Sequence, residues 1–311
     1  LVLLLLPLAP GIGATINGAR LWLRVGGLSF QPGELAKILL TIFFAGYLTV
    51  KRDSLALVRT KVAGLELPRG RDLGPLLVAW LISLGVLVFE RDLGTSLLFF
   101  GLFVSLLYIA TQRRSWLVIG SALFVVGAFL SYLAFGHVRL RVDVWLHLFG
   151  DESGSSYQIA QSLYSFASGG MFGSGLGQGF PQLVPYAKSD FIVAAFGEEL
   201  GLIGLMAMLM LYAVIVERGM RTSIACRDVF GTLLAAGLSI SLALQVFVVV
   251  GGVTRLIPLT GLTTPFLAQG GSSLVANWIA MALLIRVSDT ARAPEQDIVA
   301  LQDAPTQVVR R

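Results

Sequence analysis

Long apolar segments alternate with shorter polar connections along most of this chain. An α-helix needs about 20 apolar residues to cross the hydrocarbon core of a membrane, and most of these segments come close to that length. The pattern therefore predicts an all-α fold, a polytopic membrane helical bundle with about seven full spans. These spans are expected at residues 34–50, 74–90, 94–112, 115–135, 191–216, 229–252 and 272–287. The apolar residues 1–10 are too few to cross, so we interpret them as the remainder of a partial first span.

The charge of each connection predicts which face of the membrane it occupies. Basic residues gather in three connections, at 51–73, 113–114 and 218–227. Positively charged connections usually stay in the cytoplasm, so the alternate connections are expected to face outward. One of these, at 136–190, is unusually long for a helical bundle. We expect a bundle over residues 1–288 that includes this large extracellular loop, followed by a polar, disordered cytoplasmic tail at 289–311.

Composition supports this class and excludes others. Hydrophobic residues make up 56% of the chain and charged residues 13%, which is far too apolar for a soluble domain of 311 residues. The single cysteine, Cys226, excludes an internal disulfide and a cysteine metal cluster. The net charge of +5 lies mostly in connections and in the tail, so we attribute it to membrane topology and expect no nucleic acid as a partner.

An acid, Asp190, stands where the long glycine-rich connection becomes an apolar helix. On a helix that begins there, Asp190, Gly197, Gly201 and Gly204 would share one face, because each residue turns the helix by about 100°. Such a seam of glycines would let a neighbouring backbone approach closely. We therefore interpret this stretch as a wall of the bundle with a carboxylate at its outer edge.

Other charged residues cluster on the same predicted outward side. A charge at or inside a membrane span is costly, so each of them is a candidate functional residue. They are Arg20, Arg24, Glu34, Lys37, Glu90, Arg91, Asp92, Glu198 and Glu199. A cluster of both signs near one face is typical of a site for an anionic, polar head group.

Each candidate also has a structural alternative. Glu34 and Lys37 are spaced to form a local ion pair. Asp92 and Asp190 each precede an apolar run, where an acid often caps a helix. Glu199 has the alternative of pairing with a neighbouring helix.

The long connection contains further polar residues that we interpret as solvated. They are His137, Arg139, Arg141, Asp143 and His147. Two histidines at this spacing are a poor zinc signal. The run GSGLGQG at 173–179 has no preceding strand, so a flexible turn explains it better than a dinucleotide site does.

Five ordered motifs make the chain resemble the SEDS family of bacterial cell-wall polymerases, the FtsW, RodA and SpoVE proteins. They are NGARLWL (17–23), FQPGELAK (30–37), RDLGT (91–95), SDFIVAAFGEELG (189–201) and IPLTGLTTPFLAQGGSS (257–273). The amino-acid sequences around two of these motifs look most similar to those of actinobacterial members. The family pattern has ten spans, so this resemblance implies a fragment that begins in the third.

The resemblance implies a peptidoglycan glycosyltransferase of the bacterial cytoplasmic membrane. Such an enzyme polymerises lipid II, an undecaprenyl-pyrophosphate-linked disaccharide peptide, on the outer face and works with a class B penicillin-binding protein. The family implies no certain cofactor, and a divalent cation, Mg²⁺ or Mn²⁺, stays open. Two alternatives also stay open, namely a lipid II flippase or transporter and a non-catalytic scaffold of a cell-wall synthase complex. A transporter needs a polar path across the midplane, where Gln245 is an exception among mostly apolar residues.

Asp190 matches the essential acid of the family, and this match implies that it acts as the general base. The expected substrate-binding residues are Arg20, Trp22, Glu34, Lys37, Arg91, Asp92, Lys188, Glu198 and Glu199. The chain departs from the family pattern at Leu21, Gly33, Arg91 and the Lys188-Ser189 pair, where Arg, Ser, Pro and His-Thr are usual. The Lys188-Ser189 pair directly precedes Asp190. This difference from the family pattern is expected to change contacts with the substrate more than the role of the base.

Overall fold

The computed structural model describes residues 2–8, 13–16, 19–25, 28–56, 60–62, 65–67, 70–89, 92–148, 154 and 156–293. Its helices are α1 (Val2–Leu5), α2 (Pro32–Ala56), α3 (Gly70–Phe89), α4 (Leu93–Thr111), α5 (Ser115–Ala134), α6 (Gly136–Leu146), α7 (Tyr157–Gly169), α8 (Ile192–Ala225), α9 (Val229–Val253) and α10 (Gly271–Arg292), with short 3₁₀ turns η1 (Leu6–Leu8) and η3 (Pro181–Leu183). The expected tail lies outside the described residues from 294 onward.

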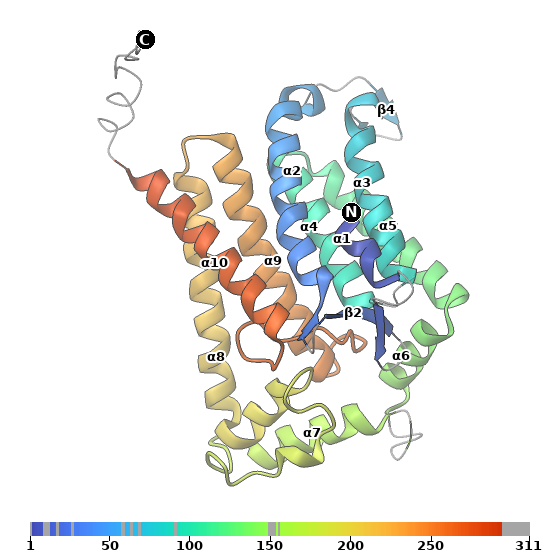
Figure 1. Ribbon diagram of the computed structural model, residues 1–311, viewed down its shortest axis with the longest axis vertical. Helices are drawn as coiled ribbons and strands as arrows, with labels where there is room; N and C mark the ends of the chain where they lie inside the picture. The colour runs from blue at the N-terminus through green and yellow to red at the C-terminus, as the bar shows by residue number, and fades with distance from the viewer. Residues whose placement is uncertain are drawn as a thin grey trace.

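Six helices in the described part of the chain are long and apolar enough to cross a membrane. They are α2, α4, α5, α8, α9 and α10. The prediction of a helical membrane bundle is therefore confirmed. The segment predicted at 74–90 falls on α3, which packs against α2 and α4 (Figure 1). Its crossing of the membrane, and with it the count of seven spans, stays a prediction.

The bundle is arranged around α9. About two thirds of the most apolar stretch of α9 is buried inside the protein, whereas only 6% of the most apolar stretch of α5 is buried. Small residues let neighbouring helices approach α9 closely. A Cβ added to Gly237 would lie 2.6 Å from the Thr41 methyl group of α2, and one added to Gly219 of α8 would meet the Ser239 hydroxyl. The outer helix α5 instead presents apolar side chains on its surface, as expected of a helix that faces lipid.

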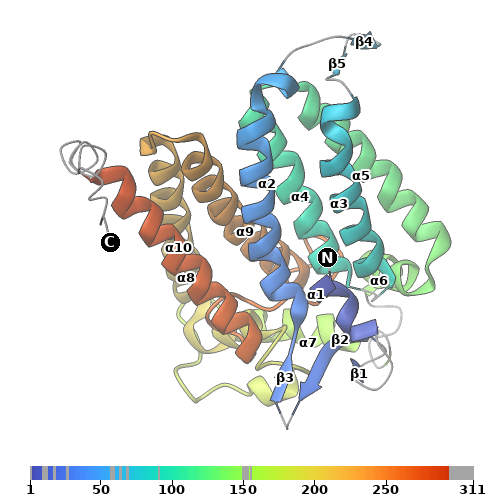
Figure 2. The same ribbon diagram turned by 45° about the horizontal axis from the view of Figure 1, so that its top comes forward.

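The two ends of the bundle differ. The connections between α2 and α3 and between α8 and α9 lie at one end, whereas α6, α7 and the strands β1 to β3 lie at the other (Figures 1 and 2). β1 (Gly13–Ile16), β2 (Ala19–Val25) and β3 (Leu28–Phe30) form a three-stranded antiparallel sheet before α2. A second hairpin, β4 (Thr60–Val62) with β5 (Leu65–Leu67), lies in the connection after α2.

The predicted glycine seam on α8 is interrupted, which corrects the sequence analysis. Gly201 has φ 67° and ψ −170°, so the helix breaks there and a continuous face does not extend from Asp190 to Gly204. The amide groups of Leu202 and Ile203 donate to the carbonyls of Gly170 and Met171, at 2.9 and 3.2 Å. A backbone does approach the glycines closely, as predicted, but it belongs to the long connection and not to another membrane helix.

The same turn also satisfies the carbonyls before the break. The amides of Ser174 and Gly175 donate to the carbonyls of Glu198 and Glu199, at 2.9 and 3.0 Å. A broken helix at membrane depth is tolerated only when its freed backbone groups find such partners. The turn at 170–175 is therefore part of α8's structure, and α8 fixes the position of the long connection.

We predict that Gly201→Ala lowers the free energy of unfolding by about 2 kcal/mol or more, because this backbone conformation is largely restricted to glycine. The added Cβ would also lie 2.3 Å from the Gly173 amide nitrogen. Thermal unfolding in detergent measures the effect. Gly127→Ala is the matched control, since Gly127 is in the exposed helix α5 and its Cβ would meet nothing within 4 Å. Equal stability of both variants would contradict the role given to Gly201.

Candidate functional site

Asp190 is held by a tight turn that directly precedes α8. Tyr186 has a positive φ of 58°, and its carbonyl accepts hydrogen bonds from the amides of Ser189 and Phe191, at 3.0 and 3.2 Å. The Phe191 side chain is only 1% exposed and anchors the turn in the core. The carboxylate of Asp190 is therefore fixed at the point where the long connection enters the bundle.

Arg141, from α6, lies beside this carboxylate. Its Nη1 atom donates to the carbonyls of Leu259 and Thr260, at 2.9 and 2.8 Å. A Cβ on Gly261 would stand 3.8 Å from Nη2 of Arg141 and 3.9 Å from Oδ2 of Asp190. The connection between α9 and α10 thus places the guanidinium and the carboxylate on either side of one glycine.

A second acid, Asp92, completes this cluster. Its carboxylate caps α4 by accepting from the Thr95 amide and hydroxyl, at 2.9 and 2.7 Å, so the capping alternative is confirmed. Burial raises the pKa of Asp92; the Thr95 bonds and the charge of Arg141 lower it, and the charge of Glu34 raises it. Asp92 therefore both caps a helix and shares the field of Arg141 with Asp190.

Burial raises the pKa of Asp190 to about 6. The Ser189 hydroxyl and the positive charge of Arg141 lower this pKa, whereas the negative charge of Asp92 raises it. A carboxylate with such a pKa is mostly ionised at neutral pH and is still a competent proton acceptor. Perturbed acids of this kind are concentrated at functional sites.

Arg141 is the candidate residue that sequence analysis missed. Its neighbours Arg139, Asp143 and His147 are exposed, as expected of solvated residues, but Arg141 is partly buried. The carbonyls that hold it are 118 and 119 residues away in the chain. The sequence around Arg141 shows only that it lies in the long connection. It gives no indication of the distant carbonyls that Arg141 bonds to.

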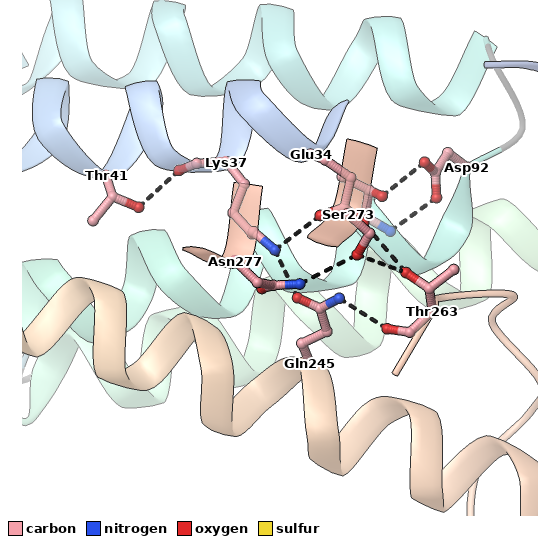
Figure 3. Close-up of polar contacts among 9 residues, drawn as sticks. Glu34, Lys37, Thr41, Asp92, Gln245, Thr263, Ser273 and Asn277 are labelled. Carbon is pink, nitrogen blue, oxygen red and sulfur yellow. Dashed lines mark hydrogen bonds and ion pairs between the residues drawn. The ribbon is translucent and has the colours of Figure 1, made fainter. Parts of the chain in front are cut away.

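A second polar cluster lies inside the bundle and is centred on Lys37 (Figure 3). The Lys37 ammonium pairs with Glu34 at 3.0 Å and donates to Oε1 of Gln245 at 2.7 Å. Lys37 and Glu34 are 6% and 7% exposed. The predicted local ion pair is therefore present, and it is buried and extended by Gln245 from α9.

Polar groups near the start of α10 extend this cluster. Thr263 accepts at its carbonyl from Nε2 of Gln245 at 2.9 Å, and its hydroxyl donates to Ser273 at 3.0 Å. Asn277 donates to the same Ser273 hydroxyl at 3.2 Å (Figure 3). The cluster therefore joins α2, α9 and α10 through side chains that are far apart in sequence.

The two neighbouring acids of α8 have different surroundings. Both carboxylate oxygens of Glu198 accept hydrogen bonds from the protein itself, one from the Ser165 hydroxyl and one from the Phe180 amide. Glu199 instead lines an open groove of about 370 Å³, together with Lys188. The Glu198 carboxylate is therefore held by the protein itself, whereas Glu199 lines an open groove.

The remaining expected substrate-binding residues lie at the edge of the described structure. Trp22 is partly buried in β2, opposite Ala14 of β1. Arg20 belongs to the same strand, and only its backbone is described. Arg91, and Glu90 before it, lie outside the described residues.

Residues 1–293 match the family model of the FtsW, RodA and SpoVE cell cycle proteins. This chain belongs to that family. A peptidoglycan glycosyltransferase RodA of Mycobacterium tuberculosis is 58% identical over 295 residues, which cover 94% of this chain and 63% of that protein. The chain therefore spans somewhat less than two thirds of the length of this relative.

Two solved structures share the fold of this chain. One is described as the structural coordination of polymerization and crosslinking by a peptidoglycan synthase complex. It matches 94% of this chain and 80% of its own, at a TM-score of 0.73 and 26% identity. The rod shape determining protein RodA of Thermus thermophilus matches 94% of this chain and 76% of its own, at a TM-score of 0.62 and 27% identity.

We predict that Lys37→Met lowers the free energy of unfolding by about 3–5 kcal/mol, because Glu34 then remains buried without its charged partner. The double variant Glu34→Gln, Lys37→Met is expected to recover part of this loss, since it removes both charges. Thermal unfolding of the three proteins in the same detergent measures the difference. A double variant less stable than Lys37→Met alone would show that the buried pair is not the source of the effect.

Proposed function

We propose that this family member is a peptidoglycan glycosyltransferase that polymerises lipid II, with Asp190 as its general base. One observation carries the proposal: Asp190 stands at the head of a membrane helix with a pKa of about 6, beside Arg141, in a segment whose residues Lys188 and Ile192 line an open groove. The name of the mycobacterial relative supports the same activity.

In the proposed reaction, a hydroxyl of the acceptor sugar attacks the anomeric carbon of the lipid-linked donor. Its O–H bond breaks as the new C–O bond forms, and Asp190 takes the proton. The bond between the donor carbon and the lipid pyrophosphate breaks, and the pyrophosphate leaves with the electron pair. This single displacement inverts the donor carbon.

The leaving pyrophosphate gains negative charge, which nearby cations stabilise. Among the described residues, Arg141 is a cation held beside Asp190. Arg20 and Arg91 remain proposed contacts of the pyrophosphate, and Lys188 remains a proposed contact of another part of the substrate. We assign Lys37 to holding the bundle together, because Glu34 and Gln245 already occupy its ammonium.

A divalent cation would supply further positive charge to the pyrophosphate. Within the described residues, no group of three or more His, Cys, Asp and Glu side chains is placed to hold one. The requirement for a divalent cation therefore stays open, and the proposed steps use only side chains of the protein.

We propose that the end of the bundle with Asp190 faces outward. The opposite end carries basic residues, among them Arg113 and Arg114 between α4 and α5, and Arg218 and Arg221 in the last turns of α8. Basic connections usually stay in the cytoplasm. Lipid II would then react at the outer face of the cytoplasmic membrane. A class B penicillin-binding protein is the proposed partner, consistent with the peptidoglycan synthase complex named for a structural relative.

The interior of the bundle favours a polymerase over a transporter. A cavity beside Lys37, lined also by Gln245 and Asn277, has a volume of about 30 Å³. That space is of the size of one water molecule and is far too small for a sugar. The groove lined by Lys188, Ile192 and Glu199 is larger, at about 370 Å³, and it borders the turn that carries Asp190.

We predict that Asp190→Asn abolishes the formation of glycan strands from lipid II, because the amide does not accept the proton. A gel assay with the full-length protein and its penicillin-binding partner measures the product. Asp143→Asn is the matched control, since Asp143 is an exposed acid on the nearby helix α6, and it should retain wild-type activity. Polymer at the wild-type rate from Asp190→Asn would remove Asp190 as the base, and polymer that persisted after every candidate acid was neutralised would favour a scaffold role.

We also predict that kcat/KM rises about tenfold per pH unit below pH 6 and then levels off as Asp190 loses its proton. Arg141 lowers the pKa of Asp190, so Arg141→Gln should move the midpoint to higher pH, and Arg141→Lys should move it back in part. Initial rates over a range of pH measure the midpoint. An unchanged midpoint in Arg141→Gln would show that the guanidinium does not act on the base.

A further inference from the structure

The groove beside Asp190 follows the first turns of α8. Its helical wall is formed by Ile192, Ala195, Phe196 and Glu199, which share one face because they are three or four residues apart. The opposite wall comes from the long connection and includes Lys188. Asp190 lies in the chain between Lys188 and Ile192, both of which line the groove. Asp190 itself does not line the groove, so a ligand there would lie against the turn that carries the proposed base.

Two side chains of opposite charge line this largely apolar groove. Lys188 is exposed, whereas Glu199 is partly buried. Within the part of the chain that the structure describes, neither side chain makes a hydrogen bond or an ion pair. The preceding acid, Glu198, has both oxygens satisfied. An unpaired carboxylate on an apolar wall is unfavourable, so the groove is suited to a ligand that brings a cation to Glu199.

We propose that the groove binds the peptide carried by the acceptor sugar, with an amine of the peptide at Glu199 and a carboxylate of the peptide at Lys188. This inference rests on the proposed function, in which the substrate is a lipid-linked disaccharide peptide, and it assigns the peptide to particular residues. The peptide is the part of that substrate that carries both charges. The apolar lipid tail would leave Glu199 unpaired, and the pyrophosphate would be repelled by it.

The dimensions of the groove agree with a short extended peptide. Helix α8 rises about 10 Å between Ile192 and Glu199, at about 1.5 Å per residue. Three residues of an extended chain span about the same length. The volume of about 370 Å³ is also within the range of ligand pockets, roughly 300–1,000 Å³.

The test compares two forms of lipid II, one with a free amine on the third residue of its peptide and one with that amine acetylated. Equilibrium binding and initial polymerisation rates are measured for the full-length protein in nanodiscs. For the wild type, acetylation should weaken binding and raise KM by about tenfold, the effect of losing one partly buried charge pair.

Substitutions then locate the contact. Glu199→Gln should bind both forms equally, and Glu199→Asp should restore part of the discrimination because it keeps the charge. Lys188→Gln should weaken binding of both forms and still discriminate between them. Glu217→Gln is the matched control, since Glu217 pairs with Arg221 near the other end of α8, and it should discriminate as the wild type does.

Each outcome decides between the two proposals. Wild-type discrimination retained in Glu199→Gln, or no discrimination in the wild type, would overturn the peptide groove. Discrimination in binding without any polymer would keep the groove and reject the proposed reaction. Polymer formation without discrimination between the two forms of lipid II would keep the proposed reaction and reject the peptide groove.

Discussion

Polar groups inside a membrane bundle must bond to one another, and here the connection between α9 and α10 bonds to both polar clusters. Its carbonyls at Leu259 and Thr260 hold Arg141, and the carbonyl of Thr263 holds Gln245 in the cluster of Lys37. The Gln269 amide also donates to the carbonyl of Lys188 at 2.7 Å, in the turn that carries Asp190. One segment thus fixes the base, its arginine and the buried ion pair relative to one another.

This arrangement links fold to function through electrostatics. Asp92 and Asp190 both act on Arg141, and Glu34 acts on Asp92, so the interior cluster and the proposed site share one field. The Ser189 hydroxyl and the positive charge of Arg141 offset part of the effect of burial on the pKa of Asp190. A rigid, partly buried carboxylate near an open groove is suited to accept a proton from a bound hydroxyl.

The helices and several local contacts were predictable, because their signals lie within a few residues of one another. The pair Glu34 and Lys37 and the cap at Asp92 are examples. The break at Gly201 was not predictable, since it depends on the turn at 170–175 that inserts there. The role of Arg141 was not predictable for the same reason, because its hydrogen-bond partners come from a distant connection. Residues that function through long-range contacts leave little trace in a local pattern.

The central claim is that Asp190 lies at the outer end of the bundle, where it can be reached from outside the cell. A full-length protein with Cys226→Ser and no other cysteine, carrying Asp190→Cys, tests it directly by labelling intact cells with a membrane-impermeant maleimide. We expect labelling at position 190 without permeabilisation, and labelling of Glu217→Cys only after permeabilisation. Labelling of position 190 only in permeabilised cells would place the carboxylate on the cytoplasmic side and contradict the account.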